Sequence, residues 1–222
     1  ELRTPLTSIQ GFAETLAAGG LNEDTVDRCT ETILRNVIRM RNLIDDLMDI
    51  SKIENREDNA ERTVVDIAHL SQELVADQKK RLESAELTAE IRPGSQANAW
   101  CNQNAVTQVL ENLLTNAIRY TDTGGHITIS IEPATDHLKV CVADTGIGIP
   151  KDALDRIFER FYRVDAARSR AVGSTGLGLS IVKHLVQAMS GTITVESEET
   201  VGSCFTLTLP LPLPDPLEPN SA

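Results

Sequence analysis

The chain has 222 residues, of which 41% are hydrophobic and 24% charged, and its net charge is −12. This is the composition of a globular chain, long enough for one large domain or two modest ones. The acidic excess argues against a nucleic-acid-binding protein, because phosphate contacts need clustered Lys and Arg. Aromatic residues make up only 3%, so the core must be aliphatic.

The four cysteines are far apart in the sequence and lack the spacing of a metal site. They are therefore predicted to be reduced, mostly buried thiols of a cytosolic protein: Cys29, Cys101, Cys141 and Cys204. No apolar run reaches the length of a membrane span, and no signal peptide is visible. Because the helical apolar pattern is already under way at residue 1, we expect a fragment, with any membrane segment lying upstream.

Residues 1–57 are predicted to form a helical hairpin. Glycines from Gly19 end the first helix, and Asn22 is placed to cap the second. From Val26 to Ser51, apolar or small residues alternate at spacings of four and three, the seam of a coiled coil or helical bundle. Two helices cannot enclose a core, so the pattern predicts a four-helix bundle made by two chains. A coiled-coil linker would also predict a dimer.

The rest of the chain has a different periodicity. Strand patterns alternate with helical patterns, which suggests an α+β fold with antiparallel strands and helices on one face, a two-layer sandwich. The expected segments are a polar hinge at 58–63, the sandwich domain at 64–211 with helices near 68–83, 104–118 and 176–189, and a Pro-rich, disordered tail at 212–222.

The helix at 104–118 contains "ENLLTNAIRYT". Asn112 and Asn116 are four residues apart and share one face, which Arg119 and Tyr120 continue. Two asparagines on one face are by themselves more often solvated amides than a binding site.

Two glycine-containing motifs follow. "DTGIGIP" places Asp144 at a strand end before Gly146 and Gly148, so that backbone could approach a flat ligand while the carboxylate accepts a hydrogen bond. A tight turn explains this motif equally well. In "GSTGLGLSIVKHL" glycines precede a helix, whose first N–H groups would receive phosphate oxygens. The spacing is not that of a Walker loop.

A third motif, "IFERFYRVD", lies between them. It places Phe158 and Phe161 three residues apart, a helical apolar pair that normally means core packing.

The order of these four motifs resembles the ATP-binding domain of sensor histidine kinases, which shares its fold with the gyrase and heat-shock-chaperone ATPases. The opening "ELRTPLTSI" resembles the phosphoacceptor box of that family with its histidine removed, and "PLTSIQGFAETL" is similar to phosphate-responsive sensor kinases. The resemblance covers residues 1 to about 210. It implies a phosphoacceptor His directly before Glu1, with Pro5 kinking the first helix one turn later.

The resemblance implies ATP and Mg²⁺ as ligands. Asp144 would accept the adenine amino group, Tyr120 would stack on adenine, and Asn116 would hold Mg²⁺. Arg119 and Arg163 would face the phosphates. The other residues implied to contact ATP are Asn112, Gly146, Gly148, Thr175, Gly176, Leu177, Gly178 and Leu179. "VDAARSRAVGST" would be a mobile lid carrying Arg168 and Arg170.

Asn112 bears on the type of reaction. In the related gyrase-type ATPases a glutamate at this place activates water, and an amide cannot act as a general base. Hydrolysis is therefore disfavoured, and the phosphoryl group is kept for another nucleophile. Glu111 projects about 100° away on the helix and is a poor substitute. Ser174 in place of a glycine, and Asn102 in place of an aspartate helix cap, are small departures from the family pattern.

On the first helix, Glu1 would orient the ring proton of the missing His, and Thr4 would orient a water that dephosphorylates the partner. Partner choice would depend on Thr7, Gly11 and Phe12. The chain is thus interpreted as the cytoplasmic catalytic core of a dimeric two-component sensor histidine kinase, acting on a response-regulator receiver domain. An ATP-gated, non-catalytic dimeric signalling module and a chaperone-type ATPase are the alternatives.

Overall fold

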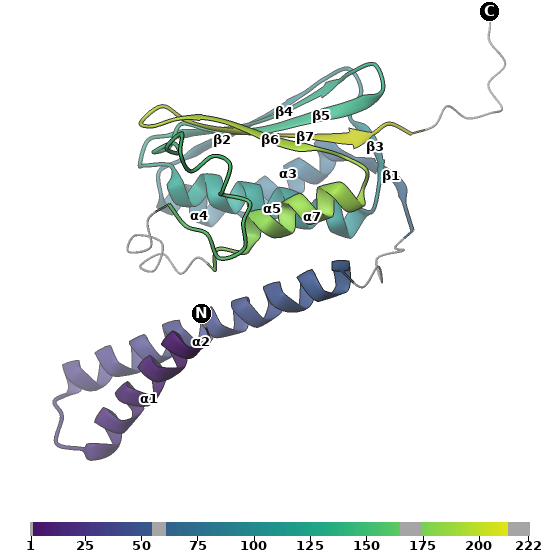
Figure 1. Cartoon of the computed structure of the whole chain (residues 1–222). Helices are drawn as coiled ribbons and strands as arrows, with labels where there is room; N and C mark the ends of the chain where they lie inside the picture. Colours follow the sequence, from purple (N-terminus) through teal and green to yellow (C-terminus); the bar gives the residue numbers. More distant parts are fainter. Residues whose placement is uncertain (1, 55–60, 165–174, 213–222) are drawn as a thin grey trace, which may run out of the picture.

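The computed structural model describes residues 2–54, 61–164 and 175–212 (Figure 1). Several predicted features lie outside these residues: Glu1, the first half of the hinge at 58–63, Arg168, Arg170 and Ser174 of the predicted lid, and nearly all of the tail at 212–222. The side chains at 46 and 49–54 are also outside the description.

The hairpin consists of α1 (Arg3–Ala18) and α2 (Glu23–Glu54); α1 and the first half of α2 project from the rest of the molecule, and the second half of α2 lies below its helices (Figure 1). Asn22 caps α2, its side-chain oxygen accepting from the backbone N–H of Thr25 at 3.0 Å. Gly19 ends α1 with a positive φ of 71°. Pro5 is buried near the start of α1.

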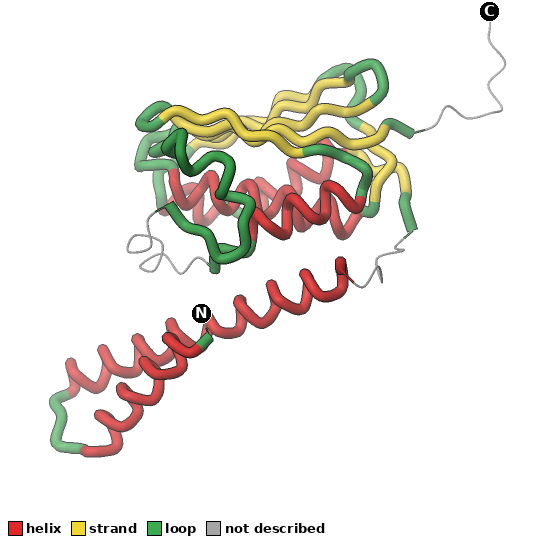
Figure 2. Tube along the Cα trace, viewed as in Figure 1, coloured by secondary structure: helices red, strands yellow, loops and turns green. Residues whose placement is uncertain are grey.

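A mixed five-stranded sheet forms one layer of the second unit, and helices cover one of its faces (Figure 2). The strand order is β2-β4-β5-β7-β6, with β2 (Thr88–Pro93), β4 (His126–Pro133), β5 (His137–Asp144), β6 (Ile193–Glu198) and β7 (Gly202–Pro210). A separate antiparallel pair joins β1 (Thr63–Asp66) to β3 (Asn98–Cys101). The helices are α3 (Ile67–Asp77), α4 (Lys79–Ser84), α5 (Gln103–Tyr120) and α7 (Gly178–Ala188).

The core lies between the sheet and the helical layer. Along β4 and β5 every second side chain is buried, as in a strand with one face covered. α5 supplies the opposing surface with Val109, Leu110, Leu113 and Leu114, each at most 1% exposed. The expected two-layer sandwich with an aliphatic core is confirmed.

Three local predictions were wrong. β2 pairs with β4 in parallel, although antiparallel pairs were expected, and β3 was not predicted. The helix expected at 68–83 is divided at Gln78, which ends α3 and precedes α4. Phe158 and Phe161 lie on turns, not on one helix, and Phe161 has a φ of 63°. Phe158 packs edge-on against Phe205, whereas Phe161 is exposed.

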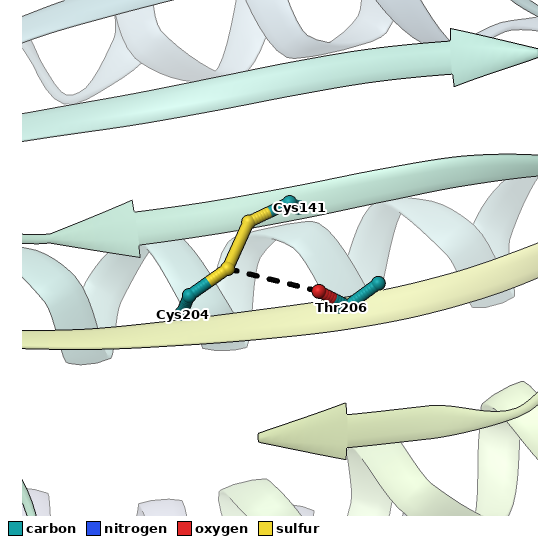
Figure 3. The surroundings of a disulfide bond; sticks show 3 residues. All are labelled: Cys141, Cys204 and Thr206. Carbon is teal, nitrogen blue, oxygen red and sulfur yellow. Dashed lines mark hydrogen bonds between the residues drawn. A yellow bond between two sulfur atoms is a disulfide. The ribbon is translucent and has the colours of Figure 1, made fainter. Parts of the chain in front are cut away.

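The prediction of four reduced cysteines was also wrong. Cys141 on β5 and Cys204 on β7 form a disulfide between adjacent strands (Figure 3). The strand register places Ala143 opposite Cys204, so the two cysteines are diagonal neighbours on the face that the helices leave uncovered. Cys29 and Cys101 are buried free thiols, as expected, and burial raises the pKa of Cys101 to about 11.

Candidate nucleotide-binding site

A cavity of about 630 Å³ lies between α5, α7 and the loop that follows β5, a size suited to a small-molecule ligand. All of the predicted ATP-binding residues line it except Gly146 and Leu177. The other lining residues, which the sequence analysis did not propose as part of the site, are Asn42, Gln108, Glu111, Thr115, Ile147, Ile149, Ile157, Tyr162, Val164, Ser203 and Phe205.

Asp144 stands at one end of the cavity, where β5 ends. Its carboxylate accepts the backbone N–H of Gly146 at 2.9 Å. Burial raises the pKa of Asp144, and backbone N–H groups of Gly146 and Ser203 oppose that shift in part. A half-buried carboxylate with two backbone donors and an open side toward the cavity can accept one more hydrogen bond from a ligand.

The loop after β5 is held tightly from two sides. A Cβ on Gly146 would collide with the carbonyl oxygen of Tyr120, and the N–H of Ile147 donates to that same oxygen at 3.1 Å. Gly148 has a φ of 69° and lies against the backbone of Glu198. A side chain at this position would strain the backbone and would also collide with Glu198. Gly146 thus shapes the wall of the site although it does not line it.

Other lining residues of the cavity lie where α7 begins. The amide of Asn112 donates to the carbonyl of Gln108 at 2.9 Å, and its oxygen lies 2.7 Å from the place that a Cβ on residue 178 would occupy. Gly178 therefore lets α7 approach α5 closely. Leu177 is fully buried and its N–H donates to the hydroxyl of Thr175 at 3.2 Å, so it positions the helix start without facing the cavity.

Two cationic side chains, Arg119 and Arg163, line the cavity and are half-buried. Arg163 donates to the carbonyl of Thr175 at 2.9 Å, which ties it to the segment that precedes α7. Together with the N–H groups at the start of α7, these cations give this part of the cavity the character of an anion site.

Asn116 lies on α5 one turn beyond Asn112 and is half-buried in the wall of the cavity. In the ranges that the structure describes, no three His, Cys, Asp or Glu side chains gather in a way that could hold a metal ion. A hard cation such as Mg²⁺ would therefore need ligand oxygens and water beside the Asn116 amide, a set that it accepts.

Glu111 also lines the cavity, from an exposed position on α5. The helix period had predicted that it would project away from Asn112. The side chain nevertheless reaches the edge of the cavity, because the cavity spans more than one face of the helix.

The predicted residues of the hairpin lie on the exposed surface of α1. Thr4 and Thr7 are exposed, and the hydroxyl of Thr7 donates to the carbonyl of Arg3 at 3.0 Å. Gly11 has open space where a Cβ would stand, and Phe12 is 37% exposed. Residues spaced by three and four lie along one helix face, so these positions form an accessible strip.

The register of the sheet explains why two residues that were not predicted, Ser203 and Phe205, line the cavity. Ser203 is the direct partner of Asp144 across β5 and β7, and Phe205 lies opposite Val142. Nothing in the local pattern of β7 distinguishes them from ordinary core residues. Tyr162, with the Arg156 guanidinium 4.4 Å above its ring, is part of the double-Phe motif and could have been included from the sequence.

The fold and the cavity are those of a nucleotide-binding α/β sandwich joined to a helical hairpin. Residues 101–213 match the family described as "Histidine kinase-, DNA gyrase B-, and HSP90-like ATPase", and residues 1–56 match the "His Kinase A (phospho-acceptor) domain". The chain belongs to the sensor histidine kinase family and contains the two domains of its catalytic core.

Curated relatives of the chain are also sensor histidine kinases. The chain is 37% identical to the sensor histidine kinase WalK of Bacillus subtilis (strain 168) over 95% of its own length and 35% of the relative. It is 35% identical to the sensor-like histidine kinase SenX3 of Mycolicibacterium smegmatis, over 97% of this chain and 56% of that protein. The chain thus spans about a third to just over half of these relatives.

Among solved structures, the Acinetobacter baumannii histidine kinase AdeS matches with a TM-score of 0.77 and 28% identity, over 95% of this chain and 96% of that one. Over the ranges described here, no helix combines the length and apolar character that crossing a bilayer requires.

Proposed function

We propose that the cavity binds Mg–ATP with its adenine at Asp144 and its phosphates beside the start of α7. The Asp144 carboxylate accepts the adenine amino group, and Tyr120 packs beside the ring. Arg119, Arg163 and the N–H groups at the start of α7 offset phosphate charge. Asn116 contributes an amide oxygen to Mg²⁺, which supplies further charge neutralisation on the phosphates.

The position of Asn112 supports phosphoryl transfer in preference to hydrolysis. Its amide oxygen lies against Gly178, at the helix start that would receive the phosphates. An amide cannot remove a proton from water, so this position lacks the general base that hydrolysis would use. Transfer to a side-chain nucleophile requires chiefly in-line positioning and charge neutralisation, which the arginines and α7 supply. This is the observation on which the proposal depends.

The acceptor is the histidine that the resemblance places directly before Glu1. A neutral imidazole is available near pH 7, because an unperturbed His titrates at about 6.5. Glu1 orients the ring proton while the other nitrogen attacks the γ-phosphorus, the bond to the β,γ-bridging oxygen breaks, and ADP leaves. The phosphoryl group then passes from the histidine to an aspartate of a response-regulator receiver domain, which restores the neutral imidazole. In the reverse direction, Thr4 orients the water that dephosphorylates the regulator.

The hairpin supports a dimeric arrangement. Several of its large apolar side chains are well exposed, which is costly for a lone hairpin and suits a four-helix bundle with a second copy. They include Leu6, Val26, Leu34, Val37, Ile44 and Leu47. The regulator would dock over Thr7, Gly11 and Phe12. Since ATP and a receiver domain are both cytoplasmic, we place this core in the cytoplasm, with any membrane contact made by a segment upstream.

The test uses a longer version of the protein that carries the upstream histidine, incubated with Mg²⁺ and γ-labelled ATP. We expect acid-labile, alkali-stable label on the protein, as phosphohistidine gives. The matched control replaces that histidine with glutamine and should bind ATP without acquiring label. If both proteins bind ATP and neither is labelled, the kinase proposal fails and the ATP-gated signalling module replaces it. Steady hydrolysis by both would favour the chaperone-type ATPase.

A further inference from the structure

One residue in the wall of the nucleotide cavity does not come from the sandwich domain. Asn42 belongs to α2 of the hairpin, more than sixty positions before the next lining residue, Gln108. α2 runs alongside the helical layer, and the domain element that it contacts most is α7 (Figure 1). The hairpin therefore takes part in forming a cavity that the sequence motifs assign to the sandwich domain alone.

The neighbour of Asn42 shows why this part of α2 faces the domain. Leu43 has no exposed surface and belongs to the hydrophobic cluster of the sandwich domain. The next apolar residues on the helix, Ile44 and Leu47, are 48% and 39% exposed. Leu43 thus anchors α2 in the domain core, and the anchored stretch brings Asn42 to the cavity.

The contact lies near the phosphate end of the proposed site. The residues at the start of α7, Gly178 and Leu179, line the same cavity, whereas Asp144 stands where β5 ends. Since α2 reaches the domain chiefly through α7, we place Asn42 beside the residues that α7 contributes to the cavity wall. An asparagine amide offers two donor hydrogens, which suit phosphate oxygens.

We propose that Asn42 donates a hydrogen bond to the phosphate chain of the nucleotide bound in its own subunit. Nucleotide binding and docking of α2 on α7 then favour each other. Thermodynamic linkage makes this coupling reciprocal: if the docked hairpin raises nucleotide affinity, nucleotide holds the hairpin docked by the same factor. The inference rests on the proposed function, because it concerns how that ATP site is completed. Asn42 is a positioning residue that ties the two domains together when the site is filled.

The first experiment measures Mg–ATP affinity of the 222-residue chain by calorimetry. Removing one hydrogen bond should weaken binding about two- to tenfold in Asn42→Ala. Asn36→Ala is the matched control: the same amide is removed from the same helix, but Asn36 bonds Ser8 and the Thr32 carbonyl inside the hairpin. The control should bind ATP as the parent does. Asn42→Asp should bind more weakly than Asn42→Ala, because its carboxylate would face phosphates.

Failure of this inference is distinguishable from failure of the proposed function. A parent chain that does not bind Mg–ATP overturns the proposed function. A parent that binds, with Asn42→Ala and Asn36→Ala binding equally well, overturns the inference alone. Equal affinities of Asn42→Asp and Asn42→Ala would overturn the placement of Asn42 beside the phosphates.

A second experiment measures the coupling without relying on affinity. Amide hydrogen exchange of residues 38–45 is followed with and without Mg–ATP, in the parent chain and in Asn42→Ala. Nucleotide should slow exchange of this stretch in the parent and have a smaller effect in the variant. Exchange in α2 that is unaffected by nucleotide in the parent would overturn the coupling.

Discussion

The side-chain oxygen of Asn112 lies 2.7 Å from the point where a Cβ on residue 178 would stand, so a larger residue at 178 would have to displace the Asn112 amide. This contact joins α5, which carries Asn112 and Asn116, to α7, the helix proposed to bind phosphate.

Gly178→Ala should therefore displace the Asn112 side chain. We expect a loss of about 0.5–1.5 kcal/mol in the free energy of unfolding, the cost of forcing a side chain out of its preferred rotamer, together with weaker Mg–ATP binding. Denaturant unfolding and calorimetry measure the two effects. In an Asn112→Ala background the added methyl meets free space, so the stability cost of Gly178→Ala should shrink. An equal cost in both backgrounds would contradict the role of this contact.

Asp144→Asn should weaken Mg–ATP binding at least tenfold, because a charged acceptor is replaced by an amide that also presents donor hydrogens to the adenine amino group. The fold should persist. Calorimetry gives the affinity, and the thermal midpoint without nucleotide reports folding. Since burial of the Asp144 carboxylate is only partly compensated by the N–H groups of Gly146 and Ser203, the variant should unfold at a similar or a higher temperature than the parent. Unchanged affinity would remove Asp144 from the site.

Stability and ATP affinity should both depend on pH, because burial raises the pKa of Asp144. The folded chain holds this proton more tightly than the unfolded chain, so this residue's contribution to stability falls as pH rises from the ordinary Asp value through the raised one. Binding needs the ionised form, so ATP affinity should drop on acidification at a less acidic pH than for an ordinary Asp. Asp144→Asn should lack this component of the pH profile of ATP affinity. A profile identical to that of the parent would contradict the assignment of this component to Asp144.

The disulfide between Cys141 and Cys204 can be tested by thiol counting. In the oxidised, denatured chain only Cys29 and Cys101 should react with an alkylating reagent, and all four cysteines should react after reduction. Removing a cross-link over a loop of this length should cost about 2–4 kcal/mol of unfolding free energy. Cys204→Ser should therefore be less stable than the parent under oxidising conditions, and the difference should largely disappear in reductant.

Thr4→Ala concerns the reverse reaction. With Thr4 proposed to orient the attacking water, its loss should slow dephosphorylation of a pre-phosphorylated receiver domain by about two orders of magnitude, the usual contribution of one positioning group. Thr4→Ser keeps the hydroxyl and should retain much of the rate. Similar phosphatase rates in Thr4→Ala and the parent would refute this role.

The sequence was sufficient for several features that depend on local pattern, although it missed β3, the break at Gln78 and the turn conformation of Phe158 and Phe161. Helical periodicity and the capping residue Asn22 predicted the hairpin, and the cap Asn102 accepts from the N–H of Ala105 at 2.8 Å as its place before α5 suggested. The ordered motifs predicted half of the residues that line the cavity, because the backbone geometry around glycines and helix starts depends on neighbouring residues in the sequence.

Tertiary structure alone decided what depends on pairing between distant segments. The parallel pairing of β2 with β4, the disulfide across 63 residues, and the arrival of Ser203 beside Asp144 all follow from strand register. Asn42 reaches the cavity only because Leu43 is buried in another domain's core. Side-chain periodicity tells which face of a segment is buried, but the identity of its neighbour is chosen by the packing of the whole chain.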